Sequence, residues 1–191
     1  MRKECVQESS SHLVRLLSVA VATLLLGSVA MAEIDPHQIY LVLSTSKTTT
    51  LQKEIDEAAA LGFRIVATAS RGGGQVALMK RTASKGEDFG YRVIGTTKID
   101  TMQKELNEAA AAGYCLLPGT MTRRERSFGP PELVAFVERG SELSRRCEYR
   151  VLGTSRTSKM EDELVAVEEE GFILVDIAQA SELAAVLERA Q

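Results

Sequence analysis

Tryptophan is absent from the 191-residue chain, and aromatic residues of all kinds make up only 5% of it. Of the two histidines, only His37 lies beyond residue 32. A histidine general base or a catalytic triad is therefore not expected. Three cysteines without a Cys-x-x-Cys motif provide too few ligands for a His/Cys metal site and no dithiol redox pair. The sequence thus predicts a protein that is not an enzyme and has no catalytic residue, metal or cofactor.

An excess of positive charge is also missing. Lys and Arg number 23 against 26 Asp and Glu, so the formal net charge is −3. Proteins that bind nucleic acid carry a strongly basic face, and nucleic acid is therefore not expected as a partner. The apolar fraction of 45% is ordinary for a globular protein and argues against disorder.

Long apolar runs are missing as well. The longest, residues 16–30, is shorter than the about 20 residues that a membrane-spanning helix needs. It follows a segment with three basic residues and ends at the small-residue motif Ala30-Met31-Ala32. This pattern predicts a signal peptide over residues 1–32, and a mature protein that is periplasmic or secreted and has no stable membrane span. Retention of the run as an N-terminal anchor is the alternative.

Two cysteines, Cys115 and Cys147, remain once residues 1–32 are removed. In an exported protein such a pair can form one disulfide. The alternative is two separate thiols that fill small apolar spaces. The sequence leaves both open.

An internal repeat is what the chain does contain. Residues 40–63, 91–114 and 149–172 align without a gap, and each begins with Tyr and places Gly before the final aromatic residue. A fixed internal register of this kind indicates duplicated structural units. The units are expected to pack into one assembly, because a domain of about 45 residues is only marginally stable alone.

Each copy has the same sequence of local signals. A short apolar run predicts a strand, and a polar turn then leads into a helix with an apolar stripe at i, i+4 and i+7. A capping residue followed three positions later by Gln or Glu predicts each helix start. The predicted pairs are Thr49 with Gln52, Asp100 with Gln103, and Ser158 with Glu161.

Two further apolar runs complete each copy. The glycine after the helix suits a left-handed C-terminal residue, and the strand that follows it leads to a third run ending in Arg. The last run, residues 183–187, is also compatible with a short helix, but the other copies favour a strand. The predicted fold class is α+β, with three tandem β-α-β-β repeats in mostly antiparallel sheets with helices packed on one face. The predicted units are 33–85, 86–144 and 145–191.

The repeat resembles a small bacterial family, the domain of unknown function numbered 4177. The matching segments are "LQKEIDEAAALGF", "MQKELNEAAAAGY" and "MEDELVAVEEEGF", together with the closing Lys80-Arg81. The resemblance covers most of residues 40–189 and implies the same fold. The family has no established catalytic residues, so the resemblance implies no site.

A glycine-rich segment, "SRGGGQV" at residues 70–76, can be compared with phosphate-binding loops. Those loops end in Gly-Lys-Ser/Thr before a helix. Here a strand follows, which favours a hairpin turn.

Two groups of basic residues are candidates for binding. Residues 120–132 form a predicted loop that also contains an aromatic residue, Phe128, and they suggest a contact surface for an anionic group or an acidic protein. The turn before each helix carries one base beside the backbone N–H groups of a helix N-terminus, where anions are favoured. Ordinary solvated charges are the alternative for both. The loop residues are Arg123, Arg124 and Arg126, and the turn residues are Lys47, Lys98 and Arg156.

The sequence therefore favours an exported, non-enzymatic binding or scaffold protein, whose partner is an unknown protein. The alternative is a small-molecule module that binds an anion at the helix N-termini.

Overall fold

The computed structural model describes residues 35, 37–82, 89–140 and 146–190. Contacts within the chain separate residues 1–33 from residues 34–191, and the description below concerns the described residues of 34–191. The predicted signal peptide lies outside the described residues. Among the helices that the structure describes, none combines the length and apolar content needed to cross a bilayer.

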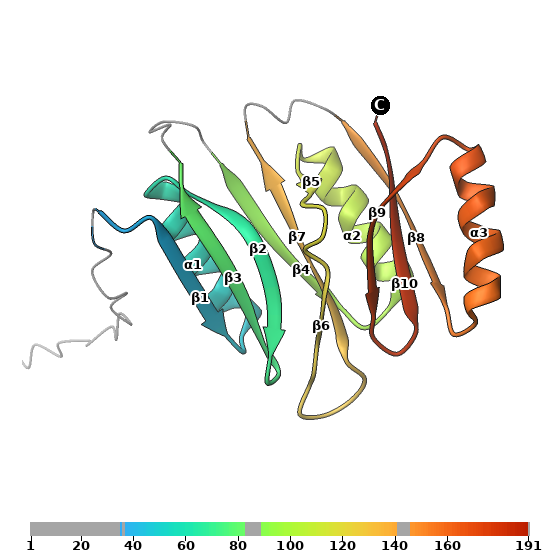
Figure 1. The fold of residues 1–191 in the computed structure, drawn as a ribbon, viewed down its shortest axis with the longest axis horizontal. Helices are drawn as coiled ribbons and strands as arrows, with labels where there is room; N and C mark the ends of the chain where they lie inside the picture. The colour runs from blue at the N-terminus through green and yellow to red at the C-terminus, as the bar shows by residue number, and fades with distance from the viewer. Residues whose placement is uncertain (1–34, 36, 83–88, 141–145, 191) are drawn as a thin grey trace, which may run out of the picture. The chain divides into compact units, whose positions relative to one another are not determined.

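The described chain consists of three sheet-and-helix units, so the predicted α+β class with tandem β-α-β-β repeats is confirmed (Figure 1). All strand pairs are antiparallel, and the closing strand of each unit lies in the middle of its sheet. The first unit has the sheet order β1-β3-β2. Its elements are β1 (Tyr40–Thr45), α1 (Thr48–Ala60), β2 (Phe63–Arg71) and β3 (Gly74–Arg81).

The other two units repeat this order. The second has the sheet order β4-β7-β5, with the additional short strand β6 paired to β7, and the third has the order β8-β10-β9. The last run of the sequence is a strand, as favoured, and the helical alternative was wrong. The elements are β4 (Gly90–Thr96), α2 (Ile99–Ala111), β5 (Cys115–Leu116), β6 (Thr122–Arg124), β7 (Glu132–Arg139), β8 (Cys147–Thr154), α3 (Thr157–Glu169), β9 (Ile173–Gln179) and β10 (Leu183–Ala190).

The helices end just before the predicted glycines, but they do not begin at the predicted capping residues. Gly62, Gly113 and Gly171 have φ of 86°, 82° and 88°, a conformation that glycine adopts without a steric penalty. The predicted capping boxes are wrong, because Thr49 and its counterparts lie inside the first turn. The N-cap residues are Lys47, Lys98 and Arg156, and none makes a side-chain cap. A threonine two residues before each N-cap accepts its N–H instead, at 3.1–3.2 Å.

Each of the first two helices is shared between two units. The buried side chains of α1 pack in one cluster with β2 and β3 of their own unit and with Tyr91, Val134 and Phe136 of the next. The helix α2 packs in the same way between its own sheet and β8 and β10. As a result β7 is buried along nearly its whole length. The described helix α3 has its own sheet on one side, and Met160 is its only buried residue.

Polar side chains on the first two helices bond to the free edge of the next sheet. Gln52 donates to the carbonyl of Tyr91 and accepts the N–H of Val93, both at 2.8 Å. On α2, Asn107 makes both bonds to the backbone of Tyr149 at 2.9 Å. Gln103 likewise accepts the N–H of Val151 on β8. The two glutamines that were predicted to cap helices therefore form hydrogen bonds between units.

A buried tyrosine joins each pair of neighbouring units. The Tyr91 hydroxyl donates to Glu138 of its own sheet and accepts the N–H of Ile65 in the preceding unit, at 3.4 Å. Tyr149 repeats this with Glu188, at 2.9 Å, and with the N–H of Leu116, at 2.7 Å. These bonds satisfy the polar ends of two large buried rings.

One disulfide also crosses between units. Cys115 on β5 and Cys147 on β8 are bonded, with their Cα atoms 6.1 Å apart. At the matching place between the first two units, the Arg64 guanidinium lies 4.0 Å from the centre of the Phe89 ring. The same contact position is thus held by a covalent bond in one interface and by a cation–π contact in the other.

The edge contact made by Asn107 predicts a measurable loss of stability. Asn107→Ala should lower the free energy of unfolding by about 1–3 kcal/mol, because it removes both hydrogen bonds that the Asn107 side chain makes to the backbone of Tyr149. Urea unfolding of purified protein measures this. The matched control is Val165→Ala, the same repeat position on α3, which is exposed and should change stability by less than about 0.5 kcal/mol. Equal losses for both variants would contradict the interpretation.

The disulfide should stabilise the second interface by restricting the unfolded chain. Its ends are 32 residues apart, and replacing both cysteines with serine should cost about 2–4 kcal/mol of unfolding free energy. Adding a reductant to the unaltered protein should give a similar loss in urea unfolding, and should leave the serine variant unchanged. A serine variant that unfolds at the wild-type urea concentration would refute this role.

Candidate functional site

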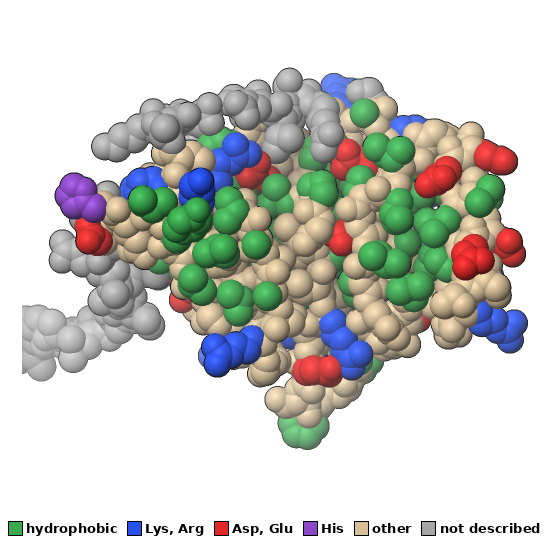
Figure 2. All heavy atoms as spheres, viewed as in Figure 1, with side chains coloured by type: hydrophobic (Ala, Val, Ile, Leu, Met, Phe, Trp, Pro, Cys, Tyr) green, Lys and Arg blue, Asp and Glu red, His purple; other side chains and the backbone are tan. Residues whose placement is uncertain are grey.

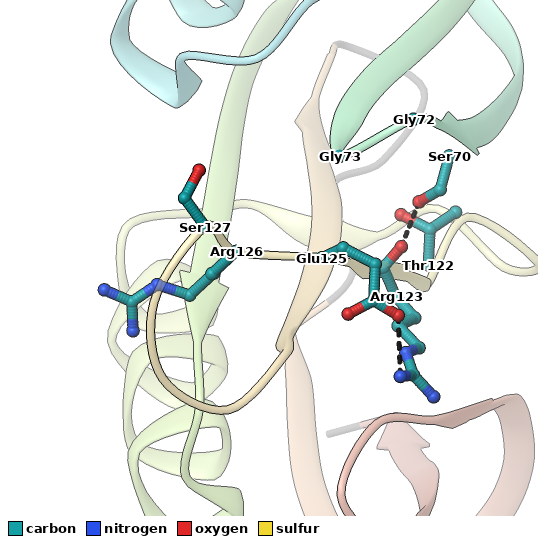
Figure 3. A pocket seen from close by; sticks show the side chains of 8 residues that line it. All are labelled: Ser70, Gly72, Gly73, Thr122, Arg123, Glu125, Arg126 and Ser127. Carbon is teal, nitrogen blue, oxygen red and sulfur yellow. Dashed lines mark hydrogen bonds and ion pairs between the residues drawn. The ribbon is translucent and has the colours of Figure 1, made fainter.

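The β6–β7 connection forms an open pocket with the turn of the first hairpin (Figure 3). That turn contains Gly72 and Gly73, with φ of 55° and 79°, so the predicted hairpin is confirmed. The pocket has a volume of about 700 Å³. Its lining residues are mostly polar or glycine: Ser70, Gly72, Gly73, Thr122, Arg123, Glu125, Arg126 and Ser127.

The predicted loop 120–132 is in part a strand, because β6 pairs with β7 over Thr122–Arg124. Two of the three candidate arginines are therefore fixed in a sheet. Ser70 donates from its hydroxyl to the carbonyl of Arg123, and Thr122 donates to the side chain of Gln75 at 2.6 Å. These bonds hold the pocket wall against β2 and β3 of the first unit.

The three arginines have different environments. Arg124 is mostly buried, pairs with Glu132 and donates to Thr48 at 2.7 Å, so it ties the β6–β7 connection to the start of α1. Arg123 is half-exposed and pairs with Glu125 at 2.6 Å. Arg126 lies 3.4 Å from Glu132 and points away from the Arg123–Glu125 pair (Figure 3). Arg123 and Arg126 thus line the pocket, and Arg124 has a structural role.

Phe128 lies in the connection that follows Arg126. Its side chain is 89% exposed, the largest value among the exposed large hydrophobic residues of the described chain. The hairpin connections of the other units are short, at residues 72–73 and 180–182. The second unit alone therefore presents an extended connection with an aromatic side chain in solvent.

The helix N-termini do not form a common site. Lys47, Lys98 and Arg156 stand at the starts of three helices in three different units. A pocket of about 450 Å³ does lie beside Lys98, but its lining includes Asp100, Glu163 and Glu182. Three carboxylates around one ammonium group oppose anion binding there. At the start of α1, Arg124 already donates to the carbonyl of Ser46 at 3.3 Å.

One cluster of buried ionisable groups joins the first two units. Glu138 is buried, accepts the Tyr91 hydroxyl and pairs with Arg64. Burial, followed by the hydrogen bond and charge of Glu138, raises the pKa of Tyr91 well above its usual 10.0. Tyr91 and Glu138 are buried and only Arg64 of the cluster is partly exposed, which suits a structural role better than proton transfer to a ligand. Within the described ranges, no group of three or more His, Cys, Asp or Glu could hold a metal ion.

Sequence reasoning missed the residues that join the units. Gln52 and Gln103 were interpreted as caps, and Asn107 and the tyrosine hydroxyls received no role. The aligned copies do contain a signal, because Tyr91 and Tyr149 recur with Glu138 and Glu188, whereas the first copy has Tyr40 with Lys80.

Comparison with known proteins identifies no relative: no protein-family model matches the chain, and neither a curated protein nor a solved structure matches it. The resemblance to the domain of unknown function 4177 therefore stays a prediction.

The raised pKa of Tyr91 predicts alkaline destabilisation. Below about pH 10 the phenol is protonated in both states, so its full contribution to stability is present. As the pH rises further, the unfolded chain loses this proton first, and stability should fall by up to about 1.4 kcal/mol per pH unit. Urea unfolding between pH 8 and 11, at roughly half-unit steps, measures the slope. Tyr91→Phe should remove this part of the slope; a variant with the wild-type slope would exclude the assignment.

Proposed function

We propose that the chain is an exported, non-enzymatic binding or scaffold protein, and that its partner docks on the β6–β7 connection. The observation that carries the proposal is Phe128, which is 89% exposed beside an open pocket with two half-exposed arginines. Exposed aromatic and arginine side chains are the residue types that contribute most to protein–protein binding energy. The rest of the assembly acts as the rigid support for this connection.

The chemistry of the pocket favours an acidic protein partner. Arg123 is held by a surface ion pair with Glu125, and such pairs contribute little to stability. Arg126 shares Glu132 with Arg124, so this carboxylate stays paired when Arg126 turns to a partner. Exchanging their present carboxylates for those of a partner therefore costs little. The hydroxyl of Ser127 adds a hydrogen-bonding group, and Phe128 supplies an apolar contact.

Export is supported by two features of the chain. Residues 1–32 have the pattern of a signal peptide, and Cys115 and Cys147 form a disulfide, a bond that persists in oxidising compartments. We place the mature protein in the periplasm or outside the cell on these grounds.

The proposal is tested by site-specific cross-linking. A photoreactive residue at position 128 should capture a partner in the native envelope, whereas the same residue at Leu61, which is exposed at the end of α1, should not. Equal capture at both positions would count against the β6–β7 connection.

The captured partner is then purified and its affinity measured. Phe128→Ala and the double variant Arg123→Ala/Arg126→Ala should each weaken binding by roughly 10- to 100-fold, a common range for hot-spot residues. Lys53→Ala, which removes another exposed base, should leave the affinity unchanged. The arginine contribution should also shrink at high salt, since exposed charges are screened. Unchanged affinity in both loop variants would overturn the proposal.

A further inference from the structure

The two interfaces within the chain follow one rule. In each interface, the sheet of the later unit uses the face opposite its own helix. This outer face packs on the helix and the second strand of the unit before it. The tyrosine that opens the following sheet becomes buried: Tyr91 is 3% exposed and Tyr149 is 1% exposed. The internal repeat therefore defines, by position, which residues a further interface of this kind would use.

Within the described residues no unit precedes the first sheet, whose outer face, turned away from α1, presents one half of this interface. We call this the head surface: Tyr40 and Val42 of β1, with Lys80 on β3. Tyr40, at the position of Tyr91 and Tyr149, is 53% exposed, and Val42 is exposed as well. In the second sheet, Gln52 bonds to the backbone edge of β4. The corresponding backbone edge of β1 borders the head surface.

The third unit presents the other half of such an interface, which is formed by a helix and the second strand of a sheet. We call this the tail surface: Glu161, Val165 and Glu168 of α3, with Ile173, Leu174 and Ile177 of β9. Leu174 is 44% exposed, whereas Ile65 and Leu116 at the same repeat position are 6% and 2% exposed. Val165 occupies the position of Asn107, which bonds to the next sheet, and is also exposed.

We propose that the head surface of one molecule docks on the tail surface of a second copy of the chain, reproducing between molecules the interface that the chain contains twice. The established geometry of the two internal interfaces carries this inference, because head and tail are its unmatched halves. The proposal is independent of the β6–β7 connection.

The composition of the two ends argues against simple capping repeats. Terminal units of a repeat array normally have a polar outer face, which keeps the array soluble. Here six of the ten exposed large hydrophobic residues in the described part of the chain belong to the head or the tail surface. Figure 2 shows hydrophobic side chains gathered over β1 and β3 and again over the third unit.

Charge changes at the two ends are complementary. Lys80 on the head stands where Glu138 and Glu188 stand in the internal interfaces. On the tail, Glu161 replaces Gln52 and Gln103, and Glu168 replaces Ala59 and Ala110. The head thus gains positive charge and the tail gains negative charge, which favours contact between two copies over contact between two identical surfaces.

The hydrogen-bonding pattern at the strand edge also permits the contact. Gln52 and Gln103 each accept an N–H from the following strand through a side-chain oxygen. Glu161 has the same acceptor and can accept the N–H of Val42. The carbonyl of Tyr40 does not require a donor from the second copy, since Gln38 donates to it at 2.8 Å.

Head and tail are different surfaces, so the contact is heterologous and propagates into a chain or closes into a ring. This gives a sharp test with the exported protein. Val42→Lys blocks the head, and Val165→Lys blocks the tail; both positions are exposed, so the fold should tolerate the change. Circular dichroism verifies folding, and Leu61→Lys is the matched control at an exposed site outside both surfaces.

Analytical ultracentrifugation should show concentration-dependent oligomers for the wild type and the control. Each blocked variant alone should associate at least tenfold more weakly. An equimolar mixture of the two should form dimers and nothing larger, because only one free head and one free tail remain. A wild type that stays monomeric up to about 1 mM, or one blocked variant that still dimerises alone, would overturn the proposal.

Cross-linking tests the register independently. Positions 38 and 173 correspond to Cys147 and Cys115, which are bonded within the chain. Mixing Gln38→Cys with Ile173→Cys under mild oxidation should therefore yield a heterodimer linked by one disulfide. Leu61→Cys mixed with Ile173→Cys should yield at least tenfold less. Equal yields from the two mixtures would show that the surfaces do not meet in this register.

Discussion

The packing of one helix between two sheets is the interaction on which the rest of the structure depends. The first two helices each have an apolar stripe that contacts their own sheet and a flank that contacts the next sheet. A single unit of this size would bury little apolar surface alone. Sharing the helices allows β7 to be buried on both faces, and the small units then pack into one compact body.

The interfaces combine this packing with polar groups that fix its register. Side-chain amides bond to an otherwise free strand edge, which also removes a template for aggregation. A buried tyrosine then links a carboxylate of its own sheet to a backbone N–H of the preceding unit. Apolar contact alone would tolerate a shift along the strand, but these paired hydrogen bonds would be lost by it.

Much of the fold could be predicted from the sequence, because repeat register, the i, i+4, i+7 stripe and the glycine after each helix are local signals. The capping boxes failed for a physical reason. Gln52 stands three residues after Thr49 but bonds to a strand about 40 residues later, and local spacing cannot reveal that partner. Likewise, Arg124 was predicted as a binding residue, but its place on β6 brings it to Glu132, with which it pairs, and to Thr48, to which it donates a hydrogen bond. Of the three candidate arginines, Arg123 and Arg126 line the pocket.

The disulfide has a mechanical consequence. Tension applied at the two ends of the folded chain would pass from Cys115 directly to Cys147 and bypass the segment between them. That segment, whose ends are 32 positions apart, has a contour length of roughly 110 Å and contains β6, β7 and the connection that carries Phe128. The connection that carries Phe128 therefore lies outside the load path between Cys115 and Cys147.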